Sequence, residues 1–555
     1  MELFEEIKAL TERLVAIPSV NGTAGERKIA DAIQAYLREI PYFRENPELV
    51  ITQELKNDPL GRCNVLALLK GGSGDERRTI LLHGHIDTVD VDDYGKYKDA
   101  AFDCAALAEM LRASQLPEDA RADLESGDYL FGRGACDMKG GVAVFLVLLK
   151  HLAENPQALR GNLLLSCNPV EETLHRGMIE ALPLLCELQK AHDLQFTLAI
   201  NNDFICPMYA GDTTRYLYTG AVGKLLPMFY IIGRETHVAQ CFEGFSPDLT
   251  AAELVRLIDR NPAYCDGYQG EYTLPPTVLK MQDLKPRYNV QTPHTACVYF
   301  NYFVHDRQVT EIMAMLKDAA QTALDNVMAQ ADSRYRAYCR LSGNRYSALT
   351  ERTQVLDYRE LYALAASVCE DDLDARISQT TDASIAAGDD QRITSLKIVQ
   401  MLSDLCGIKI PTVVVFFATP FCPHNTLKKE REDEAQVIRA LEQIAAEFSA
   451  ETGEQIKLQH FFPSLTDSSY IKIDDDADSI AMLQSCFPGY EKLYPVPLET
   501  AKALNIPAVN YGVWGKDCHK WTERIYMPYS FGRLPALLLK TIDHFFDQND
   551  KGERS

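Results

Sequence analysis

Hydrophobic positions in the first 200 residues alternate between helical spacing and short apolar runs. Helical spacing covers three segments, at about 2–16, 25–39 and 139–154. Apolar runs typical of buried strands lie between them, at 64–69, 79–83, 161–166 and 196–200. Strands that alternate with helices predict an α/β fold, in which a largely parallel sheet carries helices on both faces.

From about residue 216 the pattern changes. Strand-like runs at 216–220 and 225–232 are expected to pair, and a longer strand at 295–304 lies among helices near 248–259 and 308–330. The first pattern resumes with an apolar run at 412–417 and a helix near 429–450. We therefore predict one domain formed by residues 1–215 and 336–555, interrupted by a smaller inserted α+β domain at 216–335.

Composition and charge narrow the choice of function. A chain of 555 residues is too long for one compact core, which agrees with more than one domain. The net charge of −23 argues against nucleic acid and anionic membranes as partners. The chain shows neither a basic, apolar leader nor a run of about 20 apolar residues that could span a bilayer. Fifteen scattered cysteines without a Cys-x-x-Cys pair favour reduced thiols and a cytoplasmic location.

A histidine and an aspartate follow the apolar run at 79–83. Residues i and i+2 of a strand face the same way, so Asp87 can accept the ring N–H of His85 and prepare that ring for a metal ion. A lone His-x-Asp pair is more often a buried, hydrogen-bonded histidine. His83 has the same facing and competes for the ligand role, but it has no carboxylate two residues later.

Three further carboxylates stand beside predicted strands and helices. Asp137 precedes the helix at 139–154, where its two oxygens could bridge two cations or simply cap the helix. Glu171 and Glu172 follow the run at 161–166, and in extended backbone they would point in opposite directions. One could then bind a metal while the other acts as general base, although adjacent glutamates are also common on surfaces.

Five motifs in all offer oxygen or nitrogen ligands. The two not yet described are Asn-Asn-Asp at 201–203 and Cys-His-Lys-Trp-Thr-Glu at 518–523, where His519 lies between the only two tryptophans. The order His-x-Asp, Gly-Arg-Gly-x-x-Asp-Met-Lys-Gly-Gly, Glu-Glu, acid and late His resembles the di-zinc metallopeptidase family of carboxypeptidases, aminoacylases, acetylornithine deacetylases and succinyl-diaminopimelate desuccinylases. Residues 17–20, Ile-Pro-Ser-Val, resemble the first turn of that family. The resemblance covers most of the chain, and residues 132–141 are its most specific part.

The resemblance implies a set of ligands for two Zn²⁺ ions, although Co²⁺ or Mn²⁺ could take their place. The implied ligands are His85 and Asp203 for the first ion, Glu172 and His519 for the second, and Asp137 as the bridge. Asp212 competes with Asp203 for the fourth acidic position.

The same resemblance implies roles outside the ligand set. Asp87 would orient His85, Glu171 would act as general base, and His237 in the inserted domain would stabilise the oxyanion. In dimeric members that histidine reaches across from the other subunit, so a homodimer is expected. Asn289 resembles a substrate-binding asparagine. The arginine that binds a substrate carboxylate in this family is expected near residue 302, where the nearest is Arg307.

The expected activity is hydrolysis of an amide or peptide bond in a small amino-acid-derived substrate, as a peptidase or an N-acyl-amino-acid deacylase. A role in arginine or amino-acid catabolism belongs to the same expectation. Two alternatives are a family member without turnover that serves as a metal-containing binding or regulatory protein, and a single-metal deacetylase. Glu171 favours an enzyme, because a binding protein needs no general base. The chain departs from smaller members by insertions near 91–128 and 336–411.

Overall fold

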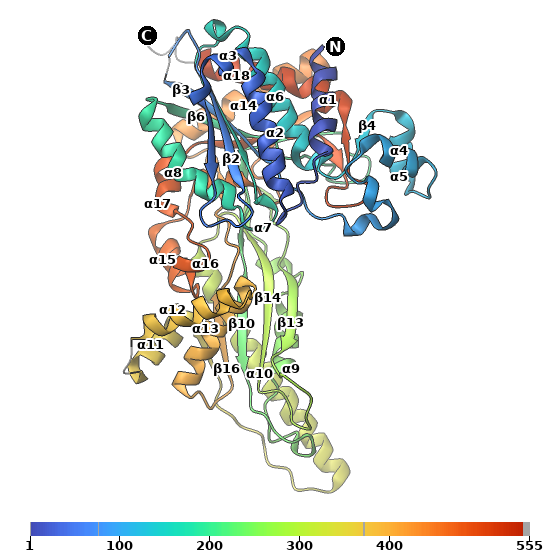
Figure 1. The fold of residues 1–555 in the computed structure, drawn as a ribbon. Coiled ribbons are helices and arrows are strands. Elements are labelled where there is room, and N and C mark those ends of the chain that lie inside the picture. The colour runs from blue at the N-terminus through green and yellow to red at the C-terminus, as the bar shows by residue number, and fades with distance from the viewer. Residues whose placement is uncertain (1, 76, 370–371, 548–555) are drawn as a thin grey trace. The chain divides into compact units, whose positions relative to one another are not determined.

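The chain folds into two compact units (Figure 1). The structure is a computed structural model that describes residues 2–75, 77–369 and 372–547. The first unit comprises the residues up to Ala221, Asn425–Ile473 and the described residues from Pro497 onward. The second comprises Val222–His424 and Asp474–Val496. The predicted domain boundary at 335 falls inside helix α10 (Val309–Ser342), so the second unit is larger than the predicted insertion.

An eight-stranded mixed sheet forms the centre of the first unit. Strands β5, β3, β6 and β19 are parallel to one another, and β7 is parallel to β18. The pairs β1–β2, β2–β5 and β19–β7 are antiparallel. The strand order is β1 (Val50–Glu54), β2 (Cys63–Leu69), β5 (Asn162–Asn168), β3 (Arg78–His85), β6 (Gln195–Asn201), β19 (Ala508–Asn510), β7 (Arg215–Tyr218) and β18 (Ile456–Gln459). The predicted α/β class is confirmed.

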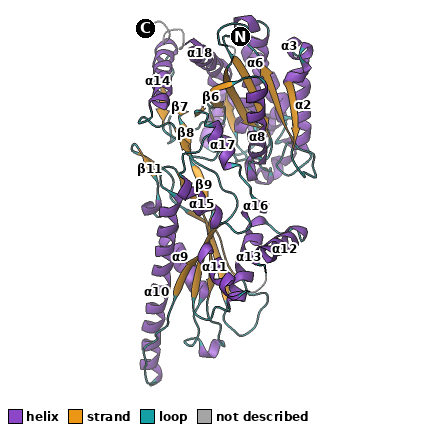
Figure 2. Cartoon of the chain, turned by 90° about the vertical axis from the view of Figure 1, so that its left-hand side faces the viewer, coloured by secondary structure: helices purple, strands orange, loops and turns teal. Residues whose placement is uncertain are grey.

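Helices lie on both sides of this sheet (Figure 2). Every residue of β2, β3 and β5 is buried, as expected for strands covered on both faces. Helix α6 is apolar almost all round and is buried along nearly its whole length, because α1 packs on it opposite the sheet. The main helices of this unit are α1 (Glu2–Val15), α2 (Gly25–Glu39), α6 (Gly140–Ala153), α8 (Arg176–Ala191), α14 (Glu432–Thr452) and α18 (Leu534–Asp547).

The insertion predicted near 91–128 belongs to the first unit and has a small core of its own. It contains η2 (Asp92–Ala100), α4 (Cys104–Arg112) and α5 (Glu118–Ser126), packed around Tyr94 and Leu107. It leads into β4 (Tyr129–Phe131), which pairs with β21 (Arg524–Tyr526) and, through it, with β20 (Gly515–Lys516). The insertion is therefore joined to the motif at 518–523.

The second unit is built on a six-stranded sheet in which most pairs are antiparallel. Its order is β13 (Thr277–Asp283), β14 (Thr295–Val304), β10 (Pro227–Ile232), β16 (Thr412–Phe417) and β15 (Gln354–Asp357), with β9 (Gly223–Leu225) beside β14. Helix α9 (Pro247–Ile258) packs on β10, β13 and β14, as does α10 on β15 and β16. Helices α11 (Tyr358–Val368), α12 (Leu373–Ala386) and α13 (Gln391–Cys406) pack around a second apolar cluster.

Two strand assignments made from the sequence were wrong. The run at 412–417 forms β16 beside β10 in the second unit, and it does not continue the first sheet. The runs at 216–220 and 225–232 do not pair with each other, because β7 joins the first sheet and β10 the second. The cause is physical: β10 and β16 are buried on both faces, so their apolar runs look the same as those of parallel strands.

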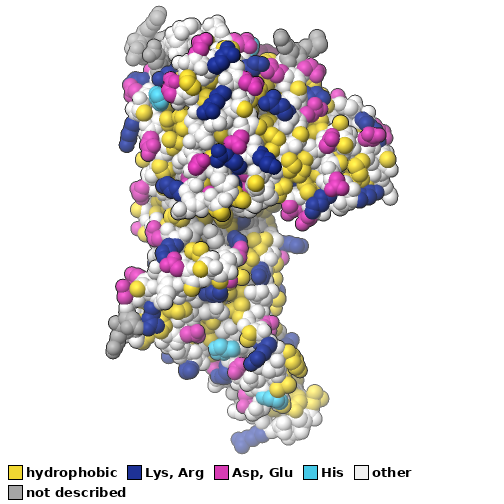
Figure 3. Space-filling model, viewed as in Figure 1, with side chains coloured by type: hydrophobic (Ala, Val, Ile, Leu, Met, Phe, Trp, Pro, Cys, Tyr) yellow, Lys and Arg dark blue, Asp and Glu magenta, His cyan; other side chains and the backbone are white. Residues whose placement is uncertain are grey.

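Charged side chains of both signs are interspersed on the face of the molecule in Figure 3. Among the described residues, no helix combines the length and the apolar character needed to cross a membrane. None of the fifteen cysteines, each of which the structure describes, forms a disulfide.

Candidate metal centre

Three strands of the first sheet end at one edge, and the candidate ligands gather there. The register places His85, the last residue of β3, opposite Asn168, the last residue of β5. His83 lies opposite Asn201, which ends β6. The loops that follow the carboxyl ends of parallel strands are where binding residues usually meet. In this protein those loops carry Asp87 and Asp203 and lead into the short helix α7 (Glu171–Leu174).

One candidate ligand group consists of His85, Asp137 and Asp203. Their ligand atoms lie within 4.8 Å of one another, and all three residues are buried. His85 Nε2 is 2.9 Å from Asp137 Oδ1. Asp137 comes from the turn η3 (Ala135–Lys139), immediately before α6.

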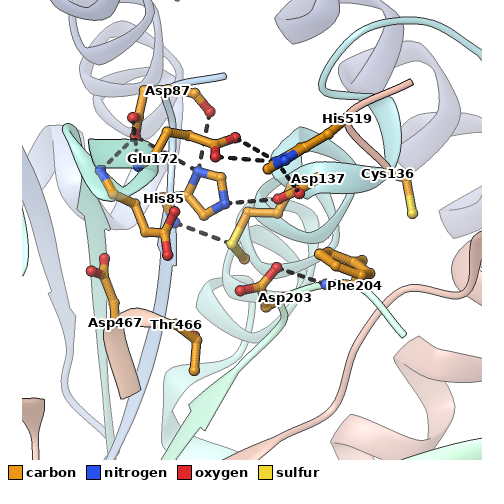
Figure 4. A network of polar contacts seen from close by, with 12 residues as sticks. His85, Asp87, Cys136, Asp137, Glu172, Asp203, Phe204, Thr466, Asp467 and His519 are labelled. Atoms are coloured by element: carbon orange, nitrogen blue, oxygen red, sulfur yellow. Dashed lines mark hydrogen bonds and ion pairs between the residues drawn. The ribbon is translucent and has the colours of Figure 1, made fainter. Parts of the chain in front are cut away.

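A second group consists of Asp137, Glu172 and His519, again within 4.8 Å. His519 Nε2 is 3.0 Å from Asp137 Oδ2 and 3.1 Å from Glu172 Oε2. Asp137 thus turns one oxygen to each histidine, and Figure 4 shows these side chains pointing toward one another. A carboxylate shared in this way is the arrangement that bridges two cations.

Crowding of the carboxylates shifts their protonation. Burial, and next the charge of Asp137, raises the pKa of Asp203 to about 7. The same two causes raise the pKa of Glu172. Burial alone would lower the pKa of His519, but hydrogen bonds with Asp137 and Glu172 raise it to about 11. Cations would neutralise the negative charge of the crowded carboxylates. Imidazole and carboxylate ligands also suit Zn²⁺, Co²⁺ and Mn²⁺, so these residues fit a pair of divalent metals.

Asp87 anchors the surrounding backbone as well as His85. The ring Nδ1 of His85 is 3.1 Å from the backbone oxygen of Asp87 and 3.6 Å from its carboxylate, so the predicted contact is made mainly by the carbonyl. The carboxylate of Asp87 instead accepts hydrogen bonds from Asn21 Nδ2 and from the N–H groups of Glu171 and Glu172, at 2.8, 3.0 and 3.1 Å. One buried aspartate therefore fixes the start of α7 relative to His85.

Glu171 and Glu172 begin a short helix, which differs from the extended backbone expected from the sequence. Their side chains nevertheless diverge. Glu172 joins Asp137 and His519, whereas Glu171 belongs to a separate buried group with His175 and Asp467. Burial raises the pKa of Glu171 well above its ordinary value, which suits a group that must accept and release a proton.

The geometry favours Asp203 over Asp212 as the fourth acidic ligand. Asp203 lies in the group with His85. Asp212 accepts hydrogen bonds from Tyr216 Oη and from the N–H groups of Met208 and Thr214, at 2.7, 3.0 and 2.9 Å. Burial would raise the pKa of Asp212, but these hydrogen bonds lower it. Its oxygens are thus already used in stabilising a turn.

His83, the other histidine of β3, makes a contact that is structural. Its Nε2 is 3.2 Å from Ser468 Oγ, and burial lowers its pKa to about 3.

Gly141, near the start of α6, lies close to the loop that carries Asp203. A Cβ on this glycine would lie 2.2 Å from the backbone oxygen of Asn202, next to Asp203. The glycine therefore lets the start of α6 approach the loop that carries Asp203.

Glu523, the last residue of the 518–523 motif, supports Asp137 from behind. Its Oε1 accepts hydrogen bonds from the N–H groups of Cys136 and Asp137, at 3.1 and 3.2 Å. Its Oε2 is 2.7 Å from Nη1 of Arg133, and both side chains are almost fully buried. Arg133 also binds Asp93 of the insertion, at 2.8 Å. This ion pair holds three distant segments around the bridging carboxylate.

We expect Arg133→Met to lower the free energy of unfolding by about 3–5 kcal/mol, because it leaves the buried carboxylate of Glu523 without its cation. Urea denaturation of the metal-free protein measures the change. Replacing the exposed Arg112 on α4 with methionine is the control and should have little effect. A loss below about 1 kcal/mol for Arg133→Met would contradict the assigned role.

The substrate-binding residues predicted from the sequence lie in the second unit. His237 is exposed and caps η5 (Val238–Gln240), and its backbone bridges to Gln291. Asn289 is exposed two residues earlier and accepts a hydrogen bond from the N–H of Gln291 at 3.0 Å. The structure therefore brings the segments of His237 and Asn289 together.

Arg307 lies apart from these two residues within the second unit. It follows the end of β14, whereas the residues before the beginning of that strand pair with the His237 segment. The ten residues of β14 span about 30 Å at about 3.3 Å per residue. One small molecule therefore cannot touch Arg307 and His237 of the same unit. Arg307 itself is within 3.1 Å of Glu311 and 3.5 Å of Tyr302 Oη.

Sequence reasoning missed His175, Asp467 and the role of Glu523. Asp467 begins η7 (Asp467–Tyr470), in which four polar or aromatic side chains in a row are buried. The stretch Ser-Leu-Thr-Asp-Ser-Ser at 464–469 looks like an ordinary loop, and nothing in it indicates burial. His175 stands four residues after Glu171, a spacing that could have indicated one helical face.

Candidate ligand groups that share one carboxylate at the carboxyl edge of an α/β sheet are typical of metal-dependent hydrolases. Residues 81–477 match peptidase family M20/M25/M40, and the chain belongs to this family. It is 38% identical to protein RocB of Bacillus subtilis over 97% of this chain and 95% of that protein. It is 35% identical to YqjN of the same organism, over 98% and 97%. The fold is similar to that of a tripeptidase from Staphylococcus aureus, with a TM-score of 0.52, 14% identity and 98% of each chain covered.

Proposed function

We propose that the protein hydrolyses an amide or peptide bond of a small amino-acid-derived substrate at a centre of two divalent cations. The observation that carries the proposal is the position of Asp137, whose two oxygens face His85 and His519 separately. His85 and Asp203 would hold one cation, Glu172 and His519 the other, and Asp137 both. Zn²⁺ is the proposed metal, and Co²⁺ and Mn²⁺ accept the same ligands.

The cations, when bound, supply Lewis-acid polarisation of the substrate carbonyl and lower the pKa of water. Glu171 takes one proton from the attacking water and later gives it to the leaving nitrogen as the C–N bond breaks. Two features support this role for Glu171. Its backbone N–H is held by Asp87 at 3.0 Å, and burial raises the pKa of its carboxyl well above the ordinary value, so it can hold the proton between the two steps.

The proposal also includes a second subunit as partner and the cytoplasm as compartment. We infer a homodimer in which His237 and Asn289 of one subunit complete the site of the other, with His237 stabilising the oxyanion. The length of β14, about 30 Å, supports this, because that strand separates the segment of His237 from Arg307 and one substrate would need both. Arg307 would bind a substrate carboxylate. We propose that the protein acts in the cytoplasm, in the catabolism of amino acids including arginine.

Removing the metal should abolish turnover reversibly. The protein is dialysed against a chelator and then assayed with N-acetyl amino acids and dipeptides, with and without added Zn²⁺, Co²⁺ or Mn²⁺. We expect the chelated protein to be inactive, and one class of substrate to be hydrolysed once metal is restored. The melting temperature should also rise, because metal binds the folded state. Hydrolysis that survives complete metal removal would contradict the proposal.

A further inference from the structure

A third buried group lies beside the two candidate metal sites. It consists of Glu171, His175 and Asp467, whose potential ligand atoms are within 4.8 Å of one another. His175 stands at the junction of α7 and α8, and Asp467 is the first residue of η7. Figure 4 shows Asp467 on the side of the network away from His519. The proposed reaction uses only Glu171 of these three residues.

The histidine ring turns one nitrogen to both carboxylates. His175 Nδ1 is 3.1 Å from Asp467 Oδ1 and 3.6 Å from Glu171 Oε1. An ionised Asp467 can only accept a hydrogen bond, so the tautomer that fits this contact carries its proton on Nδ1 of His175. In that tautomer the N–H is donated to Asp467, and the same ring nitrogen lies next to Glu171 Oε1.

The ring itself is held in place by η7. Asp467 accepts its Nδ1–H, and Tyr470 packs against the ring with centroids 5.2 Å apart. His175 has a φ of 50°, in the left-handed region that histidine adopts more readily than most residues, and this conformation ends α7 after four residues. The second oxygen of Asp467 is buried without a hydrogen-bond partner, and a buried polar atom of this kind calls for an explanation.

We propose that His175 and Asp467 are positioning residues that fix the carboxylate of Glu171 for its work as general base. The inference rests on the proposed function. Asp87 holds the backbone of Glu171, but its side chain still has three rotatable bonds. The ring edge of His175, oriented by Asp467, lies 3.6 Å from Glu171 Oε1 and limits where that carboxylate can lie. A base displaced by about 1 Å loses on the order of 10²-fold in rate, so such support matters.

The group is not assigned as a third metal site. A cation bound by Glu171 would remove the acceptor that the reaction needs, and a protonated Nδ1 cannot bind a metal. The two interpretations differ in a measurable way, because a third site predicts a third cation per chain.

The kinetic test compares His175→Ala and His175→Asn in the wild-type and Glu171→Gln backgrounds, using the substrate identified among N-acetyl amino acids and dipeptides. We expect His175→Ala to lower kcat by about 10²-fold with little change in KM. Asparagine keeps an N–H donor and tolerates positive φ, so His175→Asn should recover part of the loss. In the Glu171→Gln background, His175→Ala should have no further effect. His192→Asn, at the other end of α8, is the matched control.

Several outcomes would overturn the inference. An equal loss in both backgrounds would indicate a structural role, and a raised KM with unchanged kcat would indicate substrate binding. A third equivalent of metal that His175→Ala removes would indicate a metal site. If Glu171→Gln itself keeps full activity, Glu171 is not the general base, and that part of the proposed function fails together with the positioning role. If Glu171→Gln is inactive while His175→Ala is fully active, only the positioning role fails.

A spectroscopic test needs no substrate. In Zn²⁺-loaded protein labelled with ¹⁵N-histidine, His175 should give an Nδ1–H resonance at low field that is missing in His175→Asn. It should move upfield in Asp467→Asn, which replaces the charged acceptor with a neutral one. A ring of His175 protonated only at Nε2, or an Nδ1–H resonance that Asp467→Asn leaves in place, would contradict the proposed geometry.

Discussion

Asp137→Ala is expected to lose both cations and all measurable turnover. The residue offers Oδ1 beside His85 and Oδ2 beside His519, so its removal takes one ligand from each group at once. Loss of residues that merely support a metal ligand costs about 10–100-fold in affinity, and loss of a shared ligand should cost more than that at both sites. Metal content after gel filtration and the rate of hydrolysis measure the two effects.

Asp103→Ala is a matched control for this change. Asp103 also precedes a helix, but its carboxylate accepts a hydrogen bond from the N–H of Ala106 and caps α4. The control should lose about 1 kcal/mol of stability and keep both cations. If Asp137→Ala kept one cation at wild-type affinity, Asp137 would be a ligand of a single site and not a bridge.

Glu171→Gln is expected to keep both cations and to lower kcat by about 10²–10⁴-fold. Glutamine has the shape of glutamate but cannot take a proton from water. Glu171 is absent from both candidate ligand groups that contain Asp137, so metal content should not change. The measurement pairs metal analysis with steady-state kinetics on the same preparation.

Glu187→Gln on the exposed side of α8 serves as the control for a change of charge and should behave as wild type. Full turnover in Glu171→Gln would show that Glu171 is not the general base. Loss of a cation in this variant would place Glu171 among the ligands instead.

The part of the site that follows strand ends could be predicted from the sequence. The motifs of His85, Glu172 and Asp203 each follow an apolar run, and parallel strands bring such positions to one edge. Asp137 could be recognised because its glycine-rich motif is specific. The structure gathers these residues with His519 into the expected groups.

Residues whose roles depend on tertiary contacts could not be predicted. Glu523 and Arg133 form a buried ion pair although 390 positions separate them, and no local pattern indicates such a contact. Asp467 lies in a polar stretch whose burial depends on the packing of η7 against α8 and the strands β6 and β19. The contacts of Asp87 differ from the prediction to a smaller extent. Its carboxylate binds the start of α7, while its backbone carbonyl contacts His85.

The division of the chain into two units was the feature least predictable from the sequence. Strand β16 has six buried residues in succession, and hydrophobicity alone cannot tell a parallel strand from a central antiparallel one. Pairing with β10 decides between the two, and that pairing joins residues 180 to 190 positions apart. The helices α11 to α13, for which the sequence offered no counterpart in smaller members, cover one face of β10 and β16 in the second unit.

The number of cations per chain tests the central claim most directly. Wild-type protein and His519→Ala are stripped with a chelator, saturated with Zn²⁺, passed through a desalting column and analysed for metal and protein. The shared position of Asp137 predicts two cations per chain in the wild type and one in His519→Ala, with the site of His85 and Asp203 still filled. One cation per chain in both proteins would contradict the account and favour a single-metal hydrolase.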